Sequence, residues 1–396
     1  MLIVGDPPPL SAADAAHGAC VAAHIRGLIE ANGGWLPFSR FMEAALYAPG
    51  LGYYMAERAR FGPEGDFVTA PELSPLFQAC LADFLADALE RTGGGEIVEF
   101  GAGSGSAAAF ILPALERRGS LPARYRIVEP SPDLARRQRQ LLERWPGVAA
   151  FRDRIEWLDA PPRGEWQGVA FGNEVVDALP VERFRVLGAG CEALGVVAAG
   201  DGFAWQSRQA DAGLAAAVAS IQSCLPAPMP AGYVSECRPE LGAWFADATA
   251  ALGRGAVLFV DYGLPRAQYY HPSRDGGTLC GFRRHRRVAD PLATPGVQDL
   301  TAWVDFSALA DAAMDCGMAI GGFATQAHFL IALGIERHLA EAVEGRGERD
   351  RLAIQRDAAT IMLPGEMGER FKAIAFTRGI DGPLPGFSFR DLRDSL

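Results

Sequence analysis

The sequence contains no CxxC pair. Its seven cysteines are scattered along the chain, at positions 20, 80, 191, 224, 237, 280 and 316. Structural zinc sites need closely spaced Cys or His ligands, and disulfide-stabilised domains are small and rich in cysteine. We therefore expect no metal site and no disulfide framework, and we interpret the cysteines as reduced thiols of the core.

Long apolar runs and targeting signals are also missing. No stretch approaches the roughly twenty consecutive apolar residues that a membrane-spanning helix requires. The N-terminal segment from Met1 to Pro9 has no basic start, no apolar run of signal-peptide length and no enrichment in arginine or serine. These absences predict a cytoplasmic protein without membrane insertion.

An excess of positive charge is absent as well. The 37 Lys and Arg residues are outnumbered by 48 Asp and Glu residues, which gives a formal net charge of −11 and a pI near 5.1. An acidic surface repels phosphate backbones. The basic run Arg283 to Arg287 is flanked by Asp275, Asp290 and Asp299, so a solvated or internally paired surface explains it better than an RNA contact. We expect small molecules and proteins as partners, and no nucleic acid.

The N-terminal part of the chain has helical periodicity. Apolar residues recur at helical spacing from Val21 to Ile29, and further helices are predicted to begin at Ser39 and at the dipeptide 74–75. A chain of 396 residues is longer than one usual domain. We predict a helical region over residues 1–94 that packs on the ligand site of the following domain.

From residue 95 the pattern changes to short apolar strands that alternate with helices. Strands are predicted at 96–100, 126–129, 155–158, 168–172 and 256–261. The helix after the second strand is predicted to begin at Ser131-Pro132, a capping residue followed by proline at the first helical position. Alternating strands and helices are typical of a mostly parallel, doubly wound sheet. We therefore predict an α/β core over 95–396, with insertions at about 181–235 and 264–306. The first insertion is predicted to begin with a β-hairpin at 183–206.

A glycine-rich turn follows the first predicted strand. Gly101, Gly103 and Gly105 let the backbone turn sharply and keep side chains away from a ligand over the strand end. Dehydrogenases that bind dinucleotides use a similar turn, but Glu99 would repel a pyrophosphate and can meet the amino group of S-adenosylmethionine (SAM). Glu129 ends the second strand, where a carboxylate can accept hydrogen bonds from both ribose hydroxyls. Together these features favour SAM as the cofactor over a tight turn without a ligand.

A second group of polar residues, at 172–180, follows the predicted strand at 168–172. Ligands of open α/β sheets lie beyond the carboxyl ends of the strands, so this segment would face the methyl group of SAM. On a helical turn, Glu174 and Asp177 would share one face and could grip a guanidinium and accept its proton. The alternative interpretation is a helix start, with Asn173 as the cap and acids that favour the helix dipole.

At these residues the sequence resembles the MidA-like SAM-dependent methyltransferases, whose mitochondrial members are assembly factors of respiratory complex I. Matching stretches extend over nearly the whole chain, at 48–54, 65–74, 99–105, 173–180, 259–263, 290–306 and 367–372. The resemblance implies a seven-stranded class I methyltransferase sheet with an antiparallel last strand near 372–377, N-terminal helices and an inserted substrate lobe. It also implies a protein substrate, methylated on arginine, such as a subunit of a respiratory complex.

The resemblance further implies roles for single residues. It suggests Asp66, Glu72 and His285 for contacts with the substrate, although Asp66 and Glu72 could also lie over the cofactor or belong to a loop that caps the helix at Ser74. Asn173, in the segment after the strand at 168–172, is a candidate for cofactor binding. The sequence departs from the family at Gln78, where a glycine is common, and at 327–328, where Ala-His replaces Gly-Glu. These departures concern local substrate contacts more than cofactor binding.

Three functional hypotheses follow from the sequence. The first is a protein arginine methyltransferase in which Glu174 and Asp177 are catalytic. The second is a methyltransferase for a small molecule or RNA, which would have the same cofactor motif. The third is an assembly factor that binds SAM as a structural ligand and catalyses no reaction.

Overall fold

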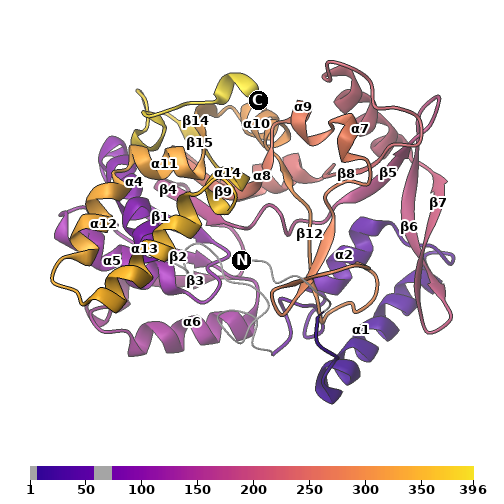
Figure 1. The fold of residues 1–396 in the computed structure, drawn as a ribbon, viewed down its shortest axis with the longest axis horizontal. Helices are drawn as coiled ribbons and strands as arrows, with labels where there is room; N and C mark the ends of the chain where they lie inside the picture. The colour runs from indigo at the N-terminus through magenta and orange to yellow at the C-terminus, as the bar shows by residue number, and fades with distance from the viewer. Residues whose placement is uncertain (1–6, 58–73) are drawn as a thin grey trace. The chain divides into compact units, whose positions relative to one another are not determined.

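The computed structural model describes residues 7–57 and 74–396, and the chain divides into two compact units (Figure 1). Unit 1 consists of the described residues of Met1–Phe67, together with Asp177–Leu241 and Leu264–Ala308. Unit 2 consists of the described residues of Val68–Val176, with Gly242–Gly263 and Leu309–Leu396. The insertions expected at about 181–235 and 264–306 therefore fall in unit 1, whereas the helical region expected over 1–94 is shared between the units.

Unit 2 is built on a long sheet with the strand order β14-β15-β9-β4-β1-β2-β3. The strands are β1 (Glu96–Phe100), β2 (Tyr125–Val128), β3 (Ile155–Leu158), β4 (Trp166–Asn173), β9 (Leu252–Leu264), β14 (Ala319–Thr325) and β15 (Phe371–Arg378). β1 runs parallel to β2 and β4, and β4 runs parallel to β9. β15 is antiparallel to both of its neighbours. The predicted α/β class I fold, with an antiparallel last strand, is confirmed.

Helices cover this sheet. They are α4 (Pro75–Thr92), α5 (Ser106–Arg117), α6 (Pro132–Arg144), η1 (Ala149–Arg154), α8 (Leu241–Thr249), α10 (Phe306–Asp315), α11 (Gln326–Ala332), α12 (Ile335–Val343), α13 (Glu348–Met362), α14 (Met367–Arg370), η3 (Pro385–Phe387) and η4 (Arg393–Ser395). Two of them begin at the serine-proline pairs that sequence analysis singles out. Ser74 accepts a hydrogen bond from Leu76 N at 3.2 Å, and Ser131 accepts one from Leu134 N at 3.4 Å. Both serines satisfy N–H groups that have no partner within the first helical turn.

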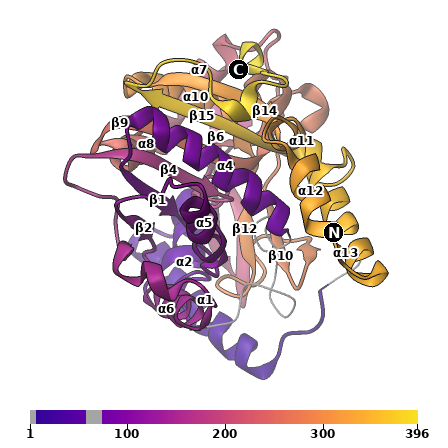
Figure 2. The ribbon, with the colours of Figure 1, turned by 90° about the vertical axis from the view of Figure 1, so that its left-hand side faces the viewer.

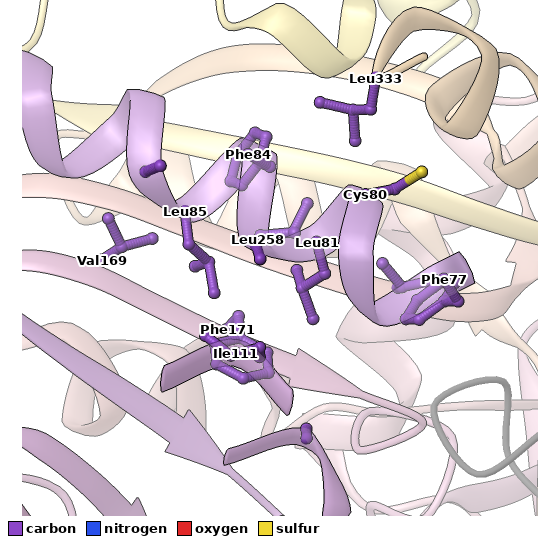
Figure 3. Packing of buried hydrophobic residues seen from close by; sticks show 14 of the residues in the cluster. Phe77, Cys80, Leu81, Phe84, Leu85, Ile111, Val169, Phe171, Leu258 and Leu333 are labelled. Carbon is purple, nitrogen blue, oxygen red and sulfur yellow. The ribbon is translucent and has the colours of Figure 1, made fainter. Parts of the chain in front are cut away.

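The core of unit 2 lies between the sheet and α4. Phe84 and Leu85 of α4 pack near Phe171 of β4 and Leu258 of β9 in one buried apolar cluster (Figures 2 and 3). The next residue of β9, Phe259, contacts Phe245 of α8 with ring centroids 6.3 Å apart. Because successive side chains of a strand point to opposite faces, β9 is apolar on both, as is typical of a parallel sheet covered by helices.

Unit 1 contains two antiparallel sheets, with the orders β7-β6-β5-β8 and β11-β10-β12. Its elements are α1 (Ala12–Ala31), α2 (Phe38–Tyr47), β5 (Glu182–Val186), β6 (Cys191–Ala199), β7 (Gly202–Gln209), α7 (Ala212–Ser223), β8 (Val234–Cys237), α9 (Arg266–Tyr269), η2 (Pro272–Arg274), β10 (Cys280–Arg283), β11 (Arg286–Val288), β12 (Asp299–Thr301) and β13 (Val304–Asp305). The predicted hairpin is thus part of a larger meander of β5, β6 and β7. The buried face of α1 and the aromatic residues of α2 form one apolar cluster with Val196 of β6.

Two further predictions concern the cysteines and the membrane. All seven cysteines have free thiols, but Cys20 and Cys224 are exposed and Cys316 is half-buried, so the interpretation as core thiols is wrong for these three.

In the described part of the chain, no helix has the length and apolar character needed to cross a membrane.

Candidate functional site

The residues expected to bind a cofactor follow neighbouring strands of unit 2. Phe100, the last residue of β1, pairs with Val128 of β2 and with Gly172 of β4. Asn173 of β4 pairs with Val260 of β9. The glycine turn, Glu129 and the segment after Asn173 therefore lie along one edge of the sheet, beyond the carboxyl ends of parallel strands. Open α/β sheets bind their ligands at this edge.

The glycine turn has the backbone that the sequence predicts. Gly101, Gly103 and Gly105 all have positive φ, at 61°, 56° and 86°, a region that favours glycine. A Cβ on Gly101 would lie 3.0 Å from Val175 Cγ2, and one on Gly105 would lie 3.1 Å from Gln138 Cγ. The turn is therefore packed closely by neighbouring side chains, and its three glycines present only main chain to the ligand edge.

Glu129 is held firmly at the end of β2. Its side chain is buried, Oε1 accepts a hydrogen bond from Ser131 N at 2.9 Å, and Oε2 accepts one from Gln138 Nε2 at 3.0 Å. A carboxylate oxygen can accept more than one hydrogen bond, so these contacts orient the group and are compatible with further donors. The geometry suits an acceptor for ribose hydroxyls.

Glu99 is buried under the glycine turn. Its Oε2 accepts a hydrogen bond from the hydroxyl of Tyr125 at 2.8 Å. The pKa of Glu99 is raised from 4.5 to about 7, chiefly because the carboxyl is buried; the hydrogen bond from Tyr125 lowers it in part, and the negative charge of Glu129 adds to the rise. A nearby cationic group would favour the ionised carboxylate and lower this pKa.

The pKa of Glu99 predicts that stability falls as pH rises. Between pH 4.5 and about 7 the folded chain retains a proton that the unfolded chain has released, so the folded state loses stability across this window. The full loss is about 3.5 kcal/mol, from roughly 1.4 kcal/mol for each of the 2.5 pH units between the two pKa values. We expect Glu99→Gln to gain stability relative to the parent chain over this range, which denaturant unfolding of both proteins without ligand would measure. Parallel curves of unfolding free energy against pH would refute this assignment.

The turn after β4 differs from the prediction. Residues 174–180 form an irregular turn and no helix, and Glu174 has a positive φ of 53°. Its N–H donates to Val260 O at 2.9 Å, and Asp261 Oδ2 accepts the N–H of Val176 at 3.0 Å. These contacts with β9 hold the backbone out of a helical conformation. The idea that Glu174 and Asp177 share a helical face is therefore wrong.

Asn173 and Glu174 are nevertheless oriented toward each other. Asn173 Nδ2 donates to Glu174 Oε1 at 3.1 Å, and because a carboxylate only accepts, this bond fixes which end of the amide is the oxygen. Asn173 Oδ1 is buried and has no hydrogen-bond partner among the described residues. A buried acceptor without a donor is costly. This position therefore suits the donor group of a ligand, such as an amine.

Asp177 is buried in unit 1, at 4% exposure, and its main chain is held by Arg238. The Arg238 guanidinium donates to Asp177 O at 3.0 Å, to Ala302 O at 2.6 Å and to Trp303 O at 2.7 Å. These bonds fix the main chain of the turn at Asp177. The catalytic role of Asp177 stays a prediction.

Of the three residues expected to contact a substrate, the structure describes one. His285 is half-buried in unit 1, at the turn between β10 and β11, where Arg284 and His285 both have positive φ. Asp66 and Glu72 lie outside the described residues. In unit 2 the structure adds Gln138 and Asp261, whose side chains bind main-chain groups at the ends of the strands, and in unit 1 it adds Arg238, which holds the main chain at Asp177. Of these, only Asp261 had a signal, as an acid at the carboxyl end of a predicted strand.

Comparisons with known proteins identify the family and support the fold. Residues 80–324 match the model of a family described as "Putative S-adenosyl-L-methionine-dependent methyltransferase". A solved structure from Burkholderia thailandensis, bound to S-adenosyl-homocysteine, is 41% identical and covers 99% of this chain and 100% of its own, with a TM-score of 0.91.

Curated relatives are similar over most of their length. A mitochondrial protein arginine methyltransferase NDUFAF7 homolog from Drosophila melanogaster is 28% identical, over 96% of this chain and 91% of the relative. The homolog from Caenorhabditis elegans is 29% identical, over 86% of this chain and 83% of the relative. Since the family model spans more than half of the sequence, this chain belongs to that family of S-adenosyl-L-methionine-dependent methyltransferases.

Proposed function

We propose that the protein transfers a methyl group from SAM to an arginine side chain of a protein substrate. The observation that carries the proposal is the similarity, over most of both chains, to relatives named protein arginine methyltransferases. The half-buried carboxylate of Glu174, at the ligand edge of the sheet, adds the chemistry that a guanidinium acceptor needs.

The residues present at this edge fit the cofactor. The three glycines of the turn offer main chain without side chains, Glu129 offers an oriented carboxylate for the ribose, and the buried Asn173 Oδ1 offers an acceptor for an amino group. Glu99 adds a carboxyl whose ionised form a cation would stabilise. When bound, SAM supplies an electrophilic methyl group on a sulfonium sulfur.

We assign to Glu174 the binding and deprotonation of the guanidinium that accepts the methyl group. Its carboxylate would accept hydrogen bonds from the guanidinium and hold one nitrogen in line for attack. As the nitrogen–carbon bond forms and the sulfur–carbon bond breaks, the nitrogen must lose a proton. Glu174 would accept that proton as a general base.

The proposal extends to the partner and the location. The substrate is a folded protein or a peptide segment, and a subunit of a respiratory complex is our first candidate from the family resemblance. We further propose that the protein acts in the cytoplasm.

The test is to identify the methyl acceptor. The purified chain is incubated with radiolabelled SAM and, separately, with the protein, nucleic acid and small-molecule fractions of a cell extract that lacks this enzyme. We expect label in the protein fraction, recovered as methylarginine after acid hydrolysis. Label confined to RNA or to a small molecule would replace the arginine assignment, and label in no fraction would favour a non-catalytic SAM-binding assembly factor.

A further inference from the structure

Gln138 lies on α6 with its side chain fully buried, at 0% exposure. Its amide group makes three hydrogen bonds to three separate elements. Nε2 donates to Gly103 O at 3.0 Å and to Glu129 Oε2 at 3.0 Å, and Oε1 accepts from Trp157 Nε1 at 3.0 Å. One neutral side chain therefore connects the glycine turn, the end of β2 and β3.

The chemistry of its partners settles the orientation of this amide. The indole N–H of Trp157 can only donate, so it must face the amide oxygen of Gln138. A main-chain carbonyl and a carboxylate can only accept, so Gly103 O and Glu129 must face the amide nitrogen. A flipped amide would lose all three bonds. Both N–H groups of the Gln138 amide thus donate to residues expected at the cofactor site, Gly103 and Glu129.

Close packing strengthens this connection. A Cβ on Gly105 would lie 3.1 Å from Cγ of Gln138 and 3.2 Å from its Cβ, so the glycine allows α6 to approach the turn. The same side chain therefore packs against the turn at Gly105 and donates a hydrogen bond to its main chain at Gly103. A shift of Gln138 would be transmitted to both ends of the turn and to the carboxylate of Glu129.

We propose that Gln138 is a positioning residue for the cofactor, which holds the glycine turn and the Glu129 carboxylate in the mutual geometry that SAM binding requires. The inference rests on the SAM binding in the proposed function, but it is independent of the methyl acceptor. It predicts that changing the hydrogen-bond donors of Gln138 weakens SAM binding through Glu129.

The test compares Gln138→Glu with Gln140→Glu, the same chemical change at an exposed position of the same helix. At about pH 8, the new carboxylate would retain an acceptor for Trp157 but would repel Glu129 and the carbonyl of Gly103. We expect SAM affinity, measured by calorimetry, to fall by about tenfold or more, the loss of one charge-assisted hydrogen bond. Gln140→Glu should bind as the parent chain does.

A pH series separates positioning from a general loss of structure. Two carboxylates in one site raise the pKa of one of them, so the variant should take up a proton as pH falls from about 8 to about 5.5. The protonated group can again donate to Glu129, and the affinity ratio of variant to parent should recover. Glu99, Tyr125 and Arg139 also surround this network, so the parent chain is titrated in parallel and only the ratio is compared.

The outcomes are distinct. Native affinity in Gln138→Glu at about pH 8, or an equal loss in Gln140→Glu, would overturn the proposal, and so would a loss that persists unchanged at low pH. If Gln138→Glu does not fold, Gln138→Met carries the test, because it removes the three hydrogen bonds without adding charge. Its affinity should fall at every pH, and native affinity would overturn the proposal. Failure of the parent chain to bind SAM would instead refute the proposed function.

Discussion

Glu174→Gln is expected to bind SAM with the parent affinity and to lose methyl transfer by about a hundredfold or more, the usual contribution of a general base. The substitution keeps the shape of the side chain and an acceptor for Asn173 Nδ2, whose bond to Glu174 Oε1 is 3.1 Å long. It removes the negative charge that would orient a guanidinium and accept its proton. Turnover with a methylarginine readout and SAM calorimetry would be measured on the same preparation.

Glu165→Gln is a matched control, because Glu165 is exposed and precedes the opposite end of β4. It should leave both measurements unchanged. Normal turnover in Glu174→Gln would rule out the carboxylate mechanism. A parallel loss of SAM affinity and turnover would instead assign Glu174 to cofactor binding.

Glu129→Ala is expected to weaken SAM binding by about 1.5 to 3 kcal/mol, roughly 10- to 150-fold, which is the range for hydrogen bonds to a charged group. The change removes the proposed acceptor for the ribose hydroxyls. It also leaves Ser131 N and Gln138 Nε2 without the carboxylate that accepts from them at 2.9 and 3.0 Å. Calorimetric titration of the parent and variant chains with SAM would measure the loss.

Glu143→Ala, an exposed change on α6, serves as the control for this experiment. Unchanged affinity in Glu129→Ala would refute the ribose assignment. If neither the parent nor the variant binds SAM, the enzymatic interpretation fails and a partner-binding scaffold becomes the better hypothesis.

Local signals predicted several elements at the edge of the sheet where we expect the cofactor. The strands at 96–100 and 155–158 were predicted with their observed bounds, because short apolar runs bounded by glycine or charge are typical of buried parallel strands. The helix start at Ser131-Pro132 was predicted from a capping residue followed by proline. The positive φ of the three turn glycines follows from their spacing after a strand.

The turn after β4 shows where local signals fail. Asn173, Glu174 and Asp177 have the spacing of a capped helix, and their sequence alone favours that interpretation. The structure has an irregular turn, because Asp261 and Val260 of β9, far along the chain, bind the N–H groups of Val176 and Glu174. A long-range hydrogen bond from a neighbouring strand thus overrides a local helix preference.

The sequence by itself determined the doubly wound fold and the residues at the ends of β1 and β2, since backbone freedom at glycine and strand periodicity are local properties. Only the tertiary structure decided how these residues are held. Gln138 is separated by 35 residues from Gly103, and by 19 from Trp157, yet contacts both. Its position on α6 has no distinguishing pattern, because a buried polar side chain is defined by partners that folding alone brings within hydrogen-bond distance.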